Sequence, residues 1–173
     1  MEYNASPGAD VLNWANSLLQ THSTRRGIVV CHSILNVASP ATWTTQGQAI
    51  YDALKGNPNL FLMLCGHNSG EARRQDVFNE KTVYSVLADY QSRTNGGSGW
   101  MRTLEFSPSN SVIRVRTYTP YFKQAETDAD SQFDLPYDME VGGQPFVVLG
   151  TYDNVPSDST VELGWPGLAA ATA

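Results

Sequence analysis

The sequence has little positive charge. Its 173 residues include 11 Lys and Arg against 17 Asp and Glu, which gives a formal net charge of -6. Basic residues are adjacent only at Arg25-Arg26 and Arg73-Arg74. Because binding to a phosphate backbone requires a basic surface, we expect no nucleic-acid partner.

Long apolar runs are also absent. No stretch approaches the roughly 18 residues that a membrane-spanning helix needs, so we expect no membrane partner. The start of the chain, Met1-Glu2-Tyr3-Asn4, is polar, so we expect no signal peptide in this chain. The low lysine content and the many small polar residues favour a secreted or periplasmic parent protein.

Cysteine is scarce as well. The only two, Cys31 and Cys65, lie in two apolar segments. Buried free thiols are the common state of such residues. If the two segments are neighbours, a disulfide between Cys31 and Cys65 is the alternative.

Two helix–strand pairs are predicted in the first part of the chain. Apolar residues at helical spacing predict helices over residues 8–20 and 44–55, and apolar runs predict strands at 27–32 and 60–65. This order predicts an α+β fold in which two helices pack on a mixed or antiparallel sheet. Both strands are apolar throughout, so we expect both of their faces to be covered.

The later part of the chain has the period of strands. Segments 73–78, 82–90, 99–106 and 111–118 alternate or are rich in Val, Thr, Tyr and Phe, and turn residues separate them. They predict a meander of antiparallel strands. Segment 123–138 is acidic and lacks a regular period, which predicts a long loop.

A domain boundary is expected near residue 139. Residues 140–173 contain two short predicted strands, and two strands alone cannot bury a core. We therefore expect residues 1–139 to form one domain and residues 140–173 to be a truncated β-sandwich segment, a short β-rich tail.

Each of the first two predicted strands ends at a histidine. His32 follows Val29-Val30-Cys31, and His67 follows Leu64-Cys65-Gly66. Ligands and catalytic groups collect at the carboxyl ends of strands in open sheets. Because neutral imidazole is a common transition-metal ligand, the pair favours a metal site. Two histidines that are hydrogen-bonded near a turn are the alternative.

These motifs carry a family resemblance. Residues 29–33 and 64–70 resemble the last two motifs of calcineurin-like metallophosphoesterases, which read strand-His and Gly-His-x-His. Segments 87–91, 97–100 and 126–133 look like secreted bacterial members of that family. The resemblance covers roughly residues 2–139, the C-terminal half of the catalytic domain, and implies part of a four-layer αββα sandwich. The tail resembles the start of a fibronectin-type-III-like domain.

The resemblance implies a two-metal hydrolase of small-molecule phosphate esters that uses a metal-activated water. His32 and His67 would be ligands of the same divalent ion (Mn, Zn, Fe or Mg), and His67 belongs to the catalytic set. The family's Asp-x-His, Gly-Asp and Gly-Asn-His motifs do not occur in residues 1–27, and Ser69 stands where a second histidine is usual. Catalytic zinc usually has three protein ligands, so we expect weak metal binding.

Two alternatives stay open. Ser69, with His67 or His32 as base and Asp76 or Asp89 as acid, indicates a metal-independent serine hydrolase, an esterase. The sequence around Ser69 is one residue off the Gly-x-Ser-x-Gly pattern. The other alternative is a non-catalytic fragment.

Arg73 is a candidate for binding the substrate phosphate through paired N–H bonds. An exposed, solvated Arg73-Arg74 pair is the alternative. The acids between residues 126 and 138 fail the spacing of a calcium-binding loop, so we expect them to be solvated. If half of the sandwich is missing, one sheet face lacks a partner, and we expect a homodimer through that face or low solubility.

Overall fold

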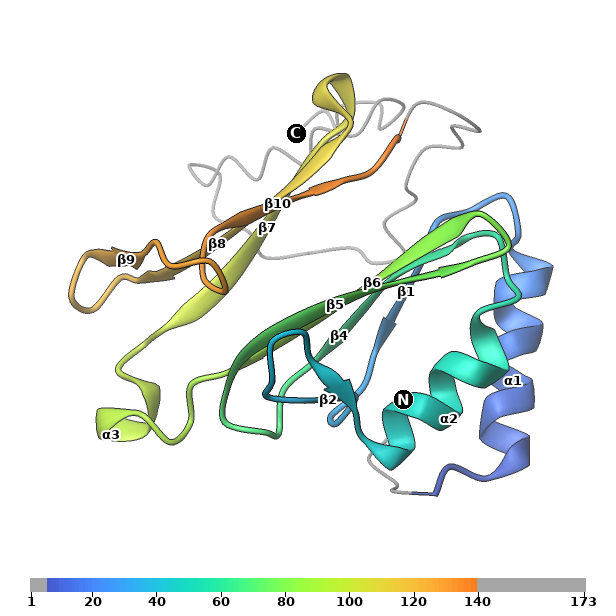
Figure 1. Cartoon of the computed structure of the whole chain (residues 1–173), viewed down its shortest axis with the longest axis horizontal. Helices are drawn as coiled ribbons and strands as arrows, with labels where there is room; N and C mark the ends of the chain where they lie inside the picture. The colour runs from blue at the N-terminus through green and yellow to red at the C-terminus, as the bar shows by residue number, and fades with distance from the viewer. Residues whose placement is uncertain (1–5, 140–173) are drawn as a thin grey trace, which may run out of the picture.

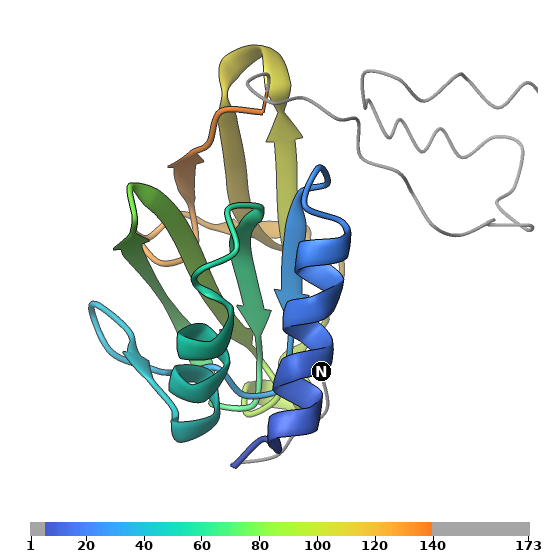
Figure 2. The same ribbon diagram turned by 90° about the vertical axis from the view of Figure 1, so that its right-hand side faces the viewer.

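Two β-sheets pack face to face, and two helices cover the outer face of one of them (Figures 1 and 2). The structure is a computed structural model and describes residues 6–139. Its helices and sheets confirm the α+β class. The predicted β-sandwich segment, residues 140–173, lies outside the described residues.

The first sheet has the strand order β1-β4-β6-β5. Its strands are β1 (Gly27–Val30), β4 (Leu60–Cys65), β6 (Lys81–Asp89) and β5 (Gly70–Phe78). β1, β4 and β6 are parallel to one another, and β5 runs antiparallel to β6. The predicted antiparallel pairing of β5 with β6 is confirmed. The predicted meander is wrong after it, because the other edge of β6 pairs with β4 and the next strand along the chain belongs to the second sheet.

Helices α1 (Ala9–Thr21) and α2 (Thr45–Leu54) cover one face of this sheet. Thr44 caps α2, and its Oγ1 accepts a hydrogen bond of 2.9 Å from the backbone N–H of Gly47. The core on this side joins both helices to β1, β4 and β6. Its fully buried members include Ile34, Leu35, Ile50, Leu54, Met63 and Leu87.

The second sheet has the order β10-β8-β7, with β9 also paired to β8. Its strands are β7 (Met101–Ser107), β8 (Val112–Thr119), β9 (Gln124–Glu126) and β10 (Phe133–Pro136), and all pairings are antiparallel. The predicted loop over residues 123–138 is thus wrong in part, since β9 and β10 lie within it.

Three short elements and a 3₁₀ turn complete the described part of the chain. The three elements are β2 (Leu35–Asn36), paired with β3 (Thr42–Trp43), and the helical turn α3 (Thr94–Gly97). A 3₁₀ turn, Pro108–Asn110, connects β7 to β8. None of the described helices has the length and apolar character needed to cross a membrane.

The space between the sheets is a second apolar core. Phe61 and Leu62 from β4 and Tyr84 and Val86 from β6 pack against side chains of the second sheet. The members from that sheet and the segment after it are Ile113, Val115, Phe133, Leu135 and Met139. β4 is therefore covered on both faces, as expected.

β1 departs from that expectation. Ile28 and Val30, on the face opposite the helices, are 39% and 59% exposed. Within residues 6–139 the second sheet packs on β4 and β6 rather than on this face of β1. The homodimer through an uncovered sheet face stays a prediction.

Candidate metal centre

His32 and His67 meet at the carboxyl ends of β1 and β4. The two strands are parallel neighbours, and their pairing continues beyond the strands, because the backbone N–H of Gly66 donates to the carbonyl oxygen of His32 at 3.1 Å. Nδ1 of His67 lies 2.8 Å from Nε2 of His32. The ring centroids are 4.6 Å apart, with the planes tilted by 59°, and both side chains are exposed.

The turn that carries His67 is held in an unusual conformation. His67 has φ of 70°, in the left-handed region, which costs a non-glycine residue roughly 1–3 kcal/mol. Neighbouring contacts fix the turn. The amide of Asn68 donates to the carbonyl oxygen of Leu35 at 2.8 Å and to Oδ1 of Asn36 at 3.2 Å. The turn is thereby anchored to the segment that follows β1 and His32.

The two imidazoles can supply some of the ligands that a divalent metal ion needs. Two nitrogens bound to one zinc at about 2.0–2.1 Å lie roughly 2.8–3.4 Å apart for bond angles between 90° and tetrahedral. The separation of 2.8 Å between the nitrogens of His32 and His67 is at the lower end of this range, so tetrahedral binding needs only a small increase. Uncharged imidazole is also a suitable donor for such ions. The pair therefore fits two adjacent positions in a coordination sphere.

A third His, Cys, Asp or Glu ligand beside this pair is not found in residues 6–139. Only one group of three or more His, Cys, Asp and Glu side chains in this range has its ligand atoms within 4.8 Å of one another, and that group is Glu71, Glu126 and Asp128. Two arginines already offset two of its three negative charges, since Arg93 bridges Glu71 and Glu126 while Arg102 pairs with Glu71. A cation therefore gains less there than at three carboxylates without basic partners.

The sequence does not predict the hydrogen-bond network around Glu71 that the structure contains. The side chain of Glu71 is 9% exposed, and Oε1 accepts from Tyr90 at 2.8 Å, from Thr117 at 3.0 Å and from Arg102. Oε2 accepts from Ser131 at 2.9 Å. Burial raises the pKa of the Tyr90 hydroxyl to about 12. Glu71 begins the strand after the His67 turn, so the network ties that turn to the second sheet.

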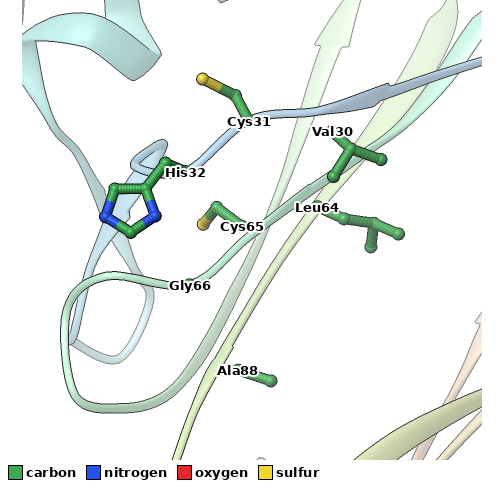
Figure 3. Close-up of a pocket in the computed structure, with 7 residues that line it drawn as sticks. All are labelled: Val30, Cys31, His32, Leu64, Cys65, Gly66 and Ala88. Atoms are coloured by element: carbon green, nitrogen blue, oxygen red, sulfur yellow. The ribbon is translucent and has the colours of Figure 1, made fainter. Parts of the chain in front are cut away.

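A mainly apolar hollow of about 640 Å³ lies beside His32 (Figure 3). Cys31 and Cys65 are on its wall, and both are free thiols. Burial raises the pKa of the Cys65 thiol, although backbone groups of Leu35 and Ile34 offset part of the effect. The complete lining is Val30, Cys31, His32, Leu64, Cys65, Gly66 and Ala88.

A second, polar hollow of about 340 Å³ has His67 on its wall. Apart from that imidazole, its lining contains hydroxyl groups, amides and one indole, with no carboxylate, lysine or arginine. The lining residues are Ser33, Asn36, Trp43, Thr44, Thr45, Gln46, His67 and Asn68.

The two acids of the predicted serine-hydrolase set lie in different places. Ser69 is exposed, two residues after His67. Arg74 binds both carboxylate oxygens of Asp76, at 2.7 and 2.5 Å, which holds this acid away from Ser69. Asp89 accepts a hydrogen bond of 2.9 Å from the backbone N–H of Gln91, and it lies opposite Gly70, the residue after Ser69, in the pairing of β5 with β6.

Arg73 points toward the second sheet. Its guanidinium carbon lies 4.1 Å from the centre of the Phe133 ring, and Nε is 3.9 Å from Oδ1 of Asp130. Arg73 lines neither of the two hollows beside the histidines. The structure therefore brings together His32 and His67, with Ser69 next to them in sequence, while Arg73 makes its contacts elsewhere.

Comparison with known proteins finds one distant relative. The chain is similar to the uncharacterized protein YvnB of Bacillus subtilis (strain 168), with 29% identity over 181 residues that cover 90% of this chain. The matched region is 14% of YvnB, so the chain spans about one seventh of that protein's length. No family model matches the chain. No solved structure matches it either.

Proposed function

We propose that this chain carries part of the metal centre of a metal-dependent phosphoester hydrolase, with His32 and His67 as ligands of one divalent ion. The observation that supports this most is the 2.8 Å approach of His67 Nδ1 to His32 Nε2 at the ends of parallel strands. The resemblance of residues 29–33 and 64–70 to metallophosphoesterase motifs agrees with it.

In such a centre the bound ion, Mn, Zn, Fe or Mg, would lower the pKa of a bound water and neutralise charge on the phosphate. The part of the chain itself is to hold and orient the two imidazoles. Asn68, through its bonds to the segment after His32, keeps the turn in the conformation that directs His67 toward its partner. Any further His, Cys, Asp or Glu ligand has to come from outside residues 6–139.

The polar hollow beside His67 is a suitable place for the alcohol part of a phosphate ester. A group in that hollow lies next to a metal ligand, so an attached phosphate can reach the ion. Because the lining has hydroxyl and amide groups beside His67 and no carboxylate, lysine or arginine, we propose an uncharged, polar alcohol group. Arg73 could contact the phosphate only after leaving Asp130 and the Phe133 ring.

The competing function is metal-independent ester hydrolysis by Ser69. It requires an acid–base partner for the serine, and Asp76 is held instead by Arg74. The exposed position of Ser69 and the place of Asp89 opposite Gly70 are the features that favour it. A chain without catalytic activity of its own is the third outcome.

Hydrolysis of p-nitrophenyl phosphate, with manganese or zinc added and then chelated, separates these functions. We expect slow turnover that is lost on chelation and in His32→Ala and His67→Ala. The matched control is His22→Ala, which removes the one histidine outside the pair, an exposed residue at the end of α1. This variant should keep the activity.

Turnover of an ester that resists chelation and disappears in Ser69→Ala would replace the proposal with serine hydrolysis. An absence of turnover with every metal would assign the catalytic role to a longer protein or to none.

A further inference from the structure

We propose that Cys31 and Cys65 form a reversible disulfide across the parallel strands β1 and β4. The strand register pairs Val30 with Leu64, and the backbone N–H of Cys31 donates to the carbonyl oxygen of Leu64 at 3.1 Å. The backbone pairing thus reaches one residue past the strand end, which places Cys31 beside Cys65 on the neighbouring strand.

The two side chains project to the same side of the sheet. Cys31 belongs to the buried core under the helices, and Cys65 packs against that core. Val30, the residue before Cys31, faces the other way and is 59% exposed. Figure 3 shows both thiols on the wall of one hollow, with the strands that carry them side by side.

The spacing of the strands permits the bond. Adjacent strands lie about 4.7–4.9 Å apart, so the Cα atoms of opposite residues fall within the roughly 4.4–6.8 Å seen in disulfides. Opposite Cβ atoms on parallel strands keep nearly the same separation, which exceeds the preferred value of about 3.8 Å. β1 therefore has to move slightly toward β4.

That movement is feasible because β1 is the edge strand of the sheet and ends at Val30, just before Cys31. A bond that needs such a movement is more easily reduced than a well-fitted structural disulfide. We therefore expect a disulfide that opens and closes with the redox conditions.

The reaction follows thiol–disulfide exchange with glutathione disulfide as oxidant. Cys65 is the more exposed of the two, since Cys31 is only 3% exposed. The Cys65 thiolate attacks one sulfur of the oxidant and releases one glutathione thiol. The Cys31 thiolate then attacks Cys65 Sγ, forms the protein disulfide and releases the second glutathione thiol. Two thiols are oxidised, one disulfide is reduced, and the two protons end on the glutathione products.

Intact-protein mass after incubation with glutathione disulfide tests this. The experiment uses the whole folded chain with a chelator present, and thiols are blocked with N-ethylmaleimide at the end. We expect a monomer two hydrogens lighter, with no maleimide and no glutathione added. Reduced glutathione should restore two maleimide-reactive thiols.

Two single-cysteine variants separate the two steps of the exchange with glutathione disulfide. Cys31→Ala should stop at a glutathione adduct on Cys65. Cys65→Ala should leave Cys31 reduced, because the oxidant cannot reach it in the folded chain. A wild-type chain that keeps both thiols, accumulates the glutathione adduct or cross-links into dimers would overturn the proposal. The mass readout requires no metal, so its failure is distinct from failure of the proposed hydrolase.

Discussion

Arg102 and Glu71 form an ion pair between the two sheets, and their side chains are only 5% and 9% exposed. Glu71 is on β5 of the first sheet and Arg102 on β7 of the second. A charge left alone in this position cannot be solvated by water, so the pair matters most when one partner is removed.

Glu71→Ala should therefore lower the free energy of unfolding by about 3–5 kcal/mol, because Arg102 is left buried without its carboxylate. The matched control is Glu105→Ala, which removes the partner of Arg114 in an ion pair whose side chains are 65% and 30% exposed. That change should cost about 1 kcal/mol or less. Guanidinium unfolding followed by circular dichroism measures both. Equal losses would show that the buried network does not hold the sheets together.

The raised pKa of Tyr90 predicts that the folded chain loses stability at high pH. Its pKa in the folded chain is raised to about 12, mainly by burial, whereas an unfolded tyrosine titrates near 10. Below pH 10 both states keep the proton, and between about pH 10 and 12 only the unfolded state releases it. Stability should therefore fall through this window, by up to roughly 2–3 kcal/mol from this group.

The check is urea unfolding at a series of pH values in the wild type and in Tyr90→Phe. The variant also loses the hydrogen bond to Glu71, so it should be less stable near neutral pH by about 1 kcal/mol. Its further loss above pH 10 should be smaller than that of the wild type. Parallel curves for the two proteins would refute the assignment to Tyr90.

Gly47 fixes how closely α2 approaches the segment after His32. A Cβ atom at Gly47 would lie 1.9 Å from the carbonyl oxygen of Ile34, so Gly47→Ala forces the helix and this segment apart. We expect a loss of about 3 kcal/mol in unfolding free energy. Gly56→Ala is the control, since nothing lies within 4 Å of a Cβ atom there. Thermal unfolding of the two variants should differ clearly, and similar midpoints would contradict the close packing.

The sequence predicts the strands better than it predicts their order. The apolar runs that become β1 and β4 are local patterns, and so is the alternation in β8. The parallel pairing of β6 with β4 depends on packing between residues far apart in the chain. No local sequence pattern predicts this pairing, which explains why the predicted meander is wrong after β6.

β10 was missed for a related reason. Phe133 and Leu135 are buried while Asp134 and Pro136 are exposed, so the alternation is present but only four residues long. Pro136 argues against a central strand, yet β10 lies at a sheet edge, where proline is tolerated.

The histidine pair could be anticipated because each member follows an apolar strand, and parallel strands end at the same edge. The Glu71 network could not. Its members Arg93 and Ser131 are 22 and 60 residues from Glu71, and each is an ordinary polar residue in the sequence. Only the packing of the two sheets brings them together.

The metal-binding role of His32 and His67 is tested most directly by titrating the purified chain with zinc in a calorimeter. We predict one weak site per chain. His32→Ala and His67→Ala should each weaken binding by more than about tenfold, because each removes one of the two protein ligands. His22→Ala should bind as the wild type does. Zinc binding that survives replacement of both His32 and His67, or that is lost in His22→Ala, would contradict the proposed centre.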